Sequence, residues 1–134
     1  MAKKQIRDFW IRFLPETTPA TTPIDDKFWN YFSSGDHILE VGAAWGRVVF
    51  ECLKRDLRVT GIDINAAEIS DLQKKIQEQG FSDNVNLYVE SAIQMHFPSN
   101  NFEGVFLQGF LSALSLDERL VALQEVHRVL KSKG

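Results

Sequence analysis

Two features of this sequence are suited to bind a nucleotide: the run of small residues Gly42-Ala43-Ala44-Trp45-Gly46, and the carboxylate of Asp63 about twenty positions later. Glycine and alanine let a ligand approach the backbone, and the N-terminus of a following helix attracts polar ligand atoms. A carboxylate accepts hydrogen bonds from both hydroxyls of a ribose. Taken singly, the turn also fits tight helix packing and Asp63 also fits a helix cap. Together, at this spacing, they favour a nucleotide site.

Alternating strands and helices are expected to position these residues. Apolar periodicity predicts strands at His37–Val41, Arg58–Ile62, Asn86–Val89 and Phe102–Leu107, and helices at Arg47–Lys54, Asn65–Gln79 and Asp117–Leu130. Ser115 and Glu118 have the spacing of a capping box at the start of the last helix. This rhythm predicts an α/β fold with a parallel sheet and flanking helices. In such sheets ligands bind beyond the carboxyl ends of the strands, where Gly42 and Asp63 stand.

The first 35 residues differ from the rest of the chain. We expect a helix over Ile6–Leu14, an extended connector over Pro15–Pro23 and a second short helix over Asp25–Phe32. Residues 1–35 are therefore predicted to form a helical and extended segment, and residues 36–134 the ligand-binding domain. The segment is rich in aromatic side chains, which have either a core role or a role in covering a substrate pocket: Phe9, Trp10, Phe13, Trp29 and Tyr31.

Composition excludes several classes of protein. The net charge of −3 argues against general binding to nucleic acid, and no apolar run approaches the ~20 residues of a membrane span. Cys52 is the only cysteine, so neither an intramolecular disulfide nor a cysteine-based zinc site can form. We expect a cytoplasmic protein that binds no metal, no nucleic acid and no membrane.

From Asp36 to Gly134 the chain resembles the class I S-adenosylmethionine-dependent methyltransferases. ILEVGAAWGR resembles the glycine-rich first motif of that family, and VTGIDIN resembles its ribose-binding acidic loop. VESAIQMHFPSNNFEGVFL is similar to the stretch that leads to the fourth strand, and LQEVHRVLKSKG is similar to the helix and turn that follow. The resemblance implies a Rossmann-like sheet in the order 3-2-1-4, S-adenosylmethionine as cofactor and a small-molecule methyl acceptor.

Carried over position by position, the resemblance also implies which residues contact the cofactor. They are Glu40, Gly42, Ala43, Ala44, Gly46, Asp63, Ile64, Ser91, Ala92 and Gln108. It implies no catalytic residue, because the sulfonium is already an activated leaving group and the enzyme mainly orients the acceptor. A dinucleotide site competes for the same loop, but its G-x-G-x-x-G fingerprint is not met, since Arg47 stands where the third glycine would be.

The chain departs from the family pattern at three positions in these motifs. Ala44 replaces the middle glycine, Trp45 is bulkier than the usual residue, and Ser91 replaces the acid that contacts the adenine amino group. The histidines His37, His96 and His127 are dispersed, which favours structural or solvent-facing roles over catalytic ones; His96 lies in a loop that borders the cofactor side. These departures bear on cofactor affinity rather than on the fold.

The sequence stops at the turn after which family members continue with further strands. We therefore expect a sheet that is incomplete at its C-terminal end, with the apolar fourth strand as an exposed edge. Three explanations are open: a truncated product, a homodimer that pairs these edges, or a methyltransferase-like module that binds without catalysis.

Overall fold

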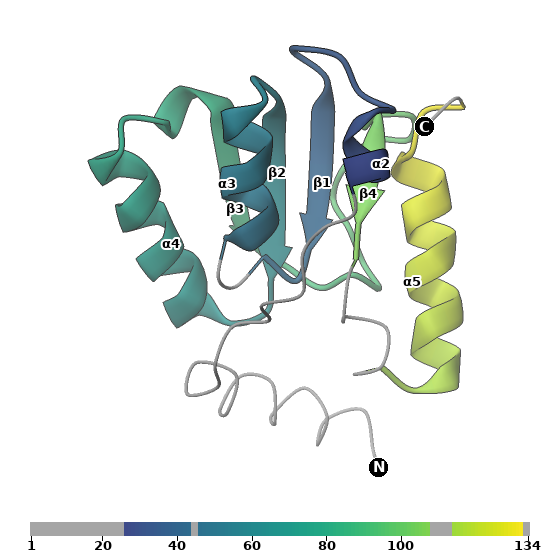
Figure 1. The fold of residues 1–134 in the computed structure, drawn as a ribbon. Coiled ribbons are helices and arrows are strands. Elements are labelled where there is room, and N and C mark those ends of the chain that lie inside the picture. Colours follow the sequence, from purple (N-terminus) through teal and green to yellow (C-terminus); the bar gives the residue numbers. More distant parts are fainter. Residues whose placement is uncertain (1–25, 44–45, 108–113, 133–134) are drawn as a thin grey trace.

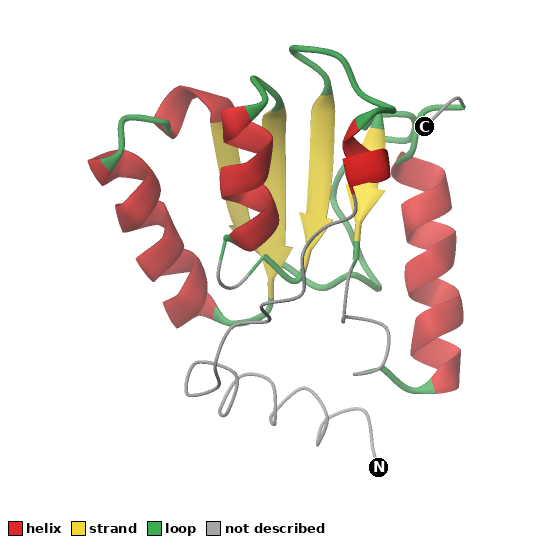
Figure 2. Ribbon diagram, in the orientation of Figure 1, coloured by secondary structure: helices red, strands yellow, loops and turns green. Residues whose placement is uncertain are grey.

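A four-stranded parallel sheet flanked by helices forms the centre of the computed structural model, which describes residues 26–43, 46–107 and 114–132 (Figure 1). Helices, strands and loops alternate along the chain as an α/β fold requires (Figure 2). The elements are α2 (Asp26–Trp29), β1 (His37–Val41), α3 (Arg47–Lys54), β2 (Arg58–Asp63), α4 (Ala66–Glu78), the 3-10 turn η2 (Ser82–Asn84), β3 (Val85–Val89), β4 (Gly104–Phe106) and α5 (Leu116–Val129).

The strand order is β3-β2-β1-β4, which confirms the predicted order. All three pairings are parallel, and β3 and β4 are the two edges of the sheet in the described part of the chain. The expected strand Phe102–Leu107 is shorter in the structure. Phe102 pairs with Leu130 instead, since its N–H donates to the Val129 carbonyl and its own carbonyl accepts from Lys131.

Each face of the sheet buries its own apolar cluster, because successive strand residues point to opposite faces. Ile38 of β1 packs on the face covered by α3 and α4, whereas Leu39 and Val41 pack on the face covered by α5. The largest side chains without solvent exposure come from both clusters: Phe102, Ile38, Leu39, Ile62, Leu72 and Ile76. Within the described residues, none of the helices has the length and apolar character needed to cross a bilayer.

The short helix α2 lies over β4 (Figure 1). The rings of Phe28 and Phe106 are 5.2 Å apart, and a Cβ at Gly104 would stand 2.4 Å from the Phe32 ring. Glycine at this position therefore lets Phe32 pack directly on the strand. Trp29 is buried beneath the guanidinium of Arg55, whereas Tyr31 is 83% exposed. Phe9, Trp10, Phe13 and the elements expected over residues 6–23 lie outside the described residues.

The predicted capping box at the start of α5 is confirmed. The hydroxyl of Ser115 accepts from the N–H of Glu118 at 3.2 Å, and the Glu118 carboxylate accepts from the N–H of Ser115 at 3.3 Å. These bonds satisfy N–H groups that have no partner within the helix. We expect Ser115→Ala to lower the free energy of unfolding by about 1 kcal/mol in urea titration. Ser70→Ala, at an exposed position inside α4, should leave it nearly unchanged; equal effects would contradict the capping role.

His37 makes folding sensitive to mild acid. Its ring nitrogen Nε2 lies 2.7 Å from the Thr60 hydroxyl, and its ring meets that of Phe102 at 4.7 Å. Burial, and then the positive charge of Arg58, lower the pKa of His37 below its ordinary 6.5, although Glu103 acts in the opposite direction. Between the lowered pKa and 6.5 the unfolded chain binds more protons than the folded chain, so stability falls as the pH drops through this range.

Replacing His37 by glutamine should remove this part of the pH dependence. We expect wild type to lose more unfolding free energy than His37→Gln between pH ~7.5 and ~5.5, as read from urea titrations. His127→Gln changes an exposed histidine on α5 and should follow wild type. Parallel pH profiles for wild type and His37→Gln would show that His37 is not the sensitive group.

Candidate functional site

The loops that follow β1, β2 and β3 lie side by side at the carboxyl edge of the sheet (Figure 1). Val41 pairs with Ile62, so Gly42 begins its loop next to Asp63. Asp63 pairs with Val89, and the N–H of Glu90 donates to the Asp63 carbonyl at 3.0 Å. The parallel register thus brings together the small-residue turn and the carboxylate, which are far apart in sequence.

The turn after β1 has the backbone that its small residues predict. The N–H groups of Gly42 and Ala43 both donate to the Ile62 carbonyl, at 2.8 and 3.0 Å, which ties the turn to β2. Gly42 is exposed and has φ = 82°, a conformation that side chains disfavour. Gly46 has φ = 72°, and a Cβ there would lie 2.5 Å from the Leu72 side chain. Gly46 therefore serves the packing of α3, and Gly42 offers open backbone.

The two most unusual residues of the turn, Ala44 and Trp45, lie outside the described residues, as does Gln108. Their expected contacts with a cofactor stay predictions.

Glu40 holds the start of α3. Its buried carboxylate accepts a hydrogen bond from the N–H of Val49 at 3.2 Å. Because Gly46 at the N-cap position has no side chain, this carboxylate from β1 satisfies an N–H of the first helical turn. A carboxylate near a helix N-terminus is also favoured by the helix dipole. A contact between Glu40 and a cofactor stays a prediction.

Asp63 ends β2 and is a buried residue, only 7% exposed. Its Oδ1 accepts from the N–H of Asn65 at 2.9 Å. The cap of α4 is the side chain of Asn65, which accepts from Glu68 at 3.1 Å, so the capping role considered for Asp63 belongs to Asn65. Burial, followed by the negative charges of Asp71 and Asp63, raises the pKa of Glu68. The structure thus places the Asp63 carboxylate at the carboxyl end of β2, and its contact with a ribose stays a prediction.

The third loop follows β3 and contains Ser91 and Ala92. The Ser91 hydroxyl accepts from the N–H of Ile93 at 3.3 Å, and the Ser91 carbonyl accepts from Gln94 at 3.2 Å. Ala92 is buried against the core cluster that includes Ile62. Ile64 is half-buried in the neighbouring loop. The structure therefore places these residues at one edge of the sheet, and their contacts with an adenine ring stay predictions.

Glu90 is a functional candidate that sequence reasoning missed. One carboxylate oxygen lies 2.5 Å from Nδ1 of His96 and accepts the His96 backbone N–H at 3.3 Å. The other oxygen is buried and has no hydrogen-bond partner among the described residues. Its position directly after β3 is a signal that could have singled it out. His96 is held against the rings of Tyr88 and Phe97, and this contact fits the structural role expected for the histidines.

In the described ranges 26–43, 46–107 and 114–132, no three His, Cys, Asp or Glu side chains gather as metal ligands would.

Cys52 is buried, and burial, followed by the nearby charge of Glu40, raises the pKa of its thiol to about 12. Its thiol is therefore unreactive as a nucleophile at neutral pH. The described residues thus place small side chains, exposed backbone and carboxylates at the carboxyl edge of the sheet.

Known proteins share this sequence pattern. The family of methyltransferase domains matches residues 38–134, more than half of the chain. A demethylmenaquinone methyltransferase from Symbiobacterium thermophilum is 28% identical over 107 residues, which cover 78% of this chain and 42% of the relative. A sterol 24-C-methyltransferase from Gibberella zeae is 29% identical over 102 residues, 75% of this chain and 26% of the relative. The chain thus spans less than half the length of these relatives.

Solved structures share the fold. A SAM-dependent methyltransferase from Methanosarcina mazei superposes with a TM-score of 0.75 at 30% identity, over 82% of this chain and 54% of that one. The cyclase SpnF superposes with a TM-score of 0.78 at 19% identity, over 98% of this chain and 57% of that one, and this likeness shows the fold alone. With the match over residues 38–134, these findings establish that the chain belongs to the family of methyltransferase domains.

Proposed function

We propose that this chain binds S-adenosylmethionine at the carboxyl edge of its sheet and transfers the methyl group to a small-molecule acceptor. The observation that carries the proposal is the register that sets exposed Gly42 beside buried Asp63. A carboxylate at the end of β2 suits the two hydroxyls of the ribose, and open backbone at Gly42 suits the amino-acid part of the cofactor.

The residues present fit the cofactor in both respects. Gly42 has a positive φ and no side chain to exclude a ligand, and Asp63 keeps its carboxylate at the sheet edge because Asn65 caps α4. When bound, the cofactor supplies a methyl group on a sulfonium, which is a good leaving group. The protein then has to hold the acceptor in line and exclude water, which orientation achieves without a dedicated base.

Relatives support a small molecule as acceptor. The names of two of them specify a demethylmenaquinone and a sterol. A third, a ubiquinone/menaquinone biosynthesis C-methyltransferase from Coxiella burnetii, is 33% identical over 72 residues, 54% of this chain and 28% of the relative. We propose an acceptor of this kind, a small organic molecule rather than a nucleic acid, in line with the net charge of −3.

Calorimetric titration of the purified chain with S-adenosylmethionine and S-adenosylhomocysteine tests the proposal. We expect saturable heat with one site per chain, and a rise in the unfolding temperature that grows with ligand concentration. Absence of both heat and thermal shift at millimolar ligand would overturn the proposal for this chain.

A second candidate is a module that binds the cofactor without transferring its methyl group. Ser91, in the third loop, favours this candidate, because its side chain carries no charge and its hydroxyl already accepts from the N–H of Ile93. Labelled methyl transfer to a quinol acceptor, measured on a chain that has already been shown to bind S-adenosylhomocysteine, separates the two. Transfer supports the enzyme, and binding without transfer to any small acceptor supports the module.

We further propose that the exposed edge of β4 pairs with a second copy of the chain, in keeping with the expected homodimer. The strand is three residues long and apolar, and it is one of the two edges of the described sheet. Unpaired edges of this kind favour association with another strand. A mass measured by light scattering that equals one chain at all concentrations would rule this pairing out.

A further inference from the structure

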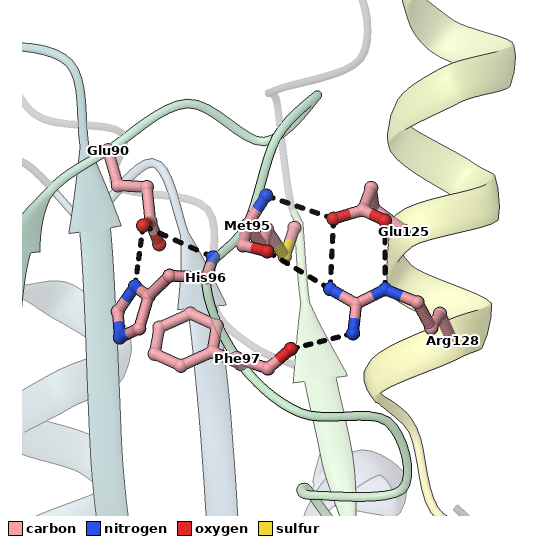
Figure 3. A network of polar contacts seen from close by, with 6 residues as sticks. All are labelled: Glu90, Met95, His96, Phe97, Glu125 and Arg128. Atoms are coloured by element: carbon pink, nitrogen blue, oxygen red, sulfur yellow. Dashed lines mark hydrogen bonds and ion pairs between the residues drawn. The ribbon is translucent and has the colours of Figure 1, made fainter.

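The loop of residues 90–97 leaves β3 at the candidate site and is held from two sides (Figure 3). On the β3 side, the Glu90 carboxylate binds both the ring and the backbone N–H of His96. These bonds fold the loop back on the residue at which it starts. On the other side, the loop faces α5, an element that lies about thirty residues further along the chain.

Arg128 and Glu125 of α5 attach to the loop backbone (Figure 3). The guanidinium of Arg128 donates to the Phe97 carbonyl at 2.6 Å and to the Met95 carbonyl at 3.1 Å. Glu125 accepts the Met95 N–H at 2.9 Å. The N–H and carbonyl of Met95 and the carbonyl of Phe97 are therefore all bound by this one pair of side chains.

The pair is itself preorganised. Nε and Nη2 of Arg128 donate to the two oxygens of Glu125, at 2.9 and 3.0 Å. This bidentate contact fixes the plane of the guanidinium and leaves its other N–H groups pointing at the two loop carbonyls. The hydrogen bond from Arg128 also lowers the pKa of Glu125, so the pair stays charged at neutral pH. A lysine has one nitrogen and no plane, so it cannot make this set of bonds.

A short turn connects the bound segment to the residues expected at the ligand. The N–H of Gln94 donates to the Ser91 carbonyl, and Met95, the next residue, is the one held by both Glu125 and Arg128. Ser91 and Ala92 are therefore linked through this turn to the bonds that Met95 makes with α5.

We propose that Arg128, held by Glu125, is a positioning residue for the cofactor: it keeps Ser91 and Ala92 at the place where they contact the adenine ring. This inference rests on the proposed function. It assigns to the C-terminal part of α5 a role in ligand binding, although no residue of α5 is among those expected to contact the ligand.

Arg128→Lys, compared with Arg119→Lys as matched control, tests the inference. Arg119 lies on the same helix and donates to the Leu114 carbonyl, outside the loop. The measurement is the affinity of each variant for S-adenosylhomocysteine and for its inosine analogue, which has an oxygen in place of the adenine amino group. Circular dichroism confirms that each variant is folded at the temperature used.

We expect Arg128→Lys to bind S-adenosylhomocysteine about tenfold more weakly, as for one lost charge-assisted bond, and to lose preference for adenine over the inosine analogue. Glu125→Gln keeps an oxygen that accepts the Met95 N–H, so it should lose less of the preference for adenine. If Arg128→Lys does not fold, Glu125→Gln takes its place in the test. If both variants prefer adenine over the inosine analogue as strongly as wild type does, the positioning role of Arg128 is overturned, but the proposed function is not. A wild-type chain that binds neither ligand overturns the proposed function as well.

Discussion

Asp63→Asn is expected to weaken binding of S-adenosylhomocysteine by roughly 30-fold, because two ribose hydroxyls lose a charged acceptor at a cost of about 1 kcal/mol each. The substitution keeps the shape of the side chain. The amide oxygen of asparagine can still accept the N–H of Asn65, which Oδ1 accepts in the structure at 2.9 Å. A loss of affinity would therefore report the charge rather than a rearranged loop. Asp63→Ala removes both acceptors and should abolish most of the binding.

Asp71→Asn is the matched control for this prediction. Asp71 is an exposed carboxylate on α4, so its substitution removes the same charge but leaves the expected ribose acceptor in place. Calorimetry should find wild-type affinity for Asp71→Asn, and thermal unfolding should show that all three variants are folded. If Asp63→Asn binds as tightly as wild type, Asp63 is not the ribose acceptor, whatever else the chain binds.

Phe102→Ala should lower the free energy of unfolding by about 3–5 kcal/mol, the range for large aromatic residues in a packed core. Phe102 has no solvent exposure, and its ring meets the rings of Phe97 and His37 at 5.2 and 4.7 Å. Its backbone also joins the segment before β4 to the end of α5. Truncation therefore leaves a cavity where the sheet, the 90–97 loop and α5 meet.

Urea unfolding followed by circular dichroism measures this effect. Phe81→Ala serves as control, because Phe81 is 36% exposed and its truncation should cost far less. Phe102→Leu should lie between the two, since it keeps part of the buried volume. A loss below about 1 kcal/mol for Phe102→Ala would mean that the core around β4 closes over the missing ring.

Local patterns in the chain are enough to predict most of the fold. The apolar pattern in residues 37–89 predicts β1, α3, β2, α4 and β3 to within a residue at each end, because buried strands appear as short apolar runs and helices repeat apolar residues every three or four positions. Ser115 and Glu118 predict the start of α5 for an equally local reason, a pair of bonds between neighbours. The strand order is what the resemblance to the methyltransferase family implies, since right-handed crossovers restrict the arrangements of four parallel strands without selecting this one.

Pairings between distant residues are decided by the tertiary structure alone. Phe102 pairs with Leu130 rather than extending β4, the Glu40 carboxylate binds the start of α3, and Arg128 reaches the loop after β3. No short-range sequence pattern relates the two residues of each contact. Each contact depends on which polar groups lie close to one another once the sheet has formed.

The turn at Gly42 and the carboxylate of Asp63 show both sides of this division. Their residue types and their spacing along the chain are sufficient to indicate a nucleotide site. That Asp63 does not cap α4 depends on Asn65 taking that role, and that Gly42 stands beside Asp63 depends on the register of β1 against β2. Composition and spacing determine which groups the chain carries, and packing in three dimensions determines which of them face the same edge.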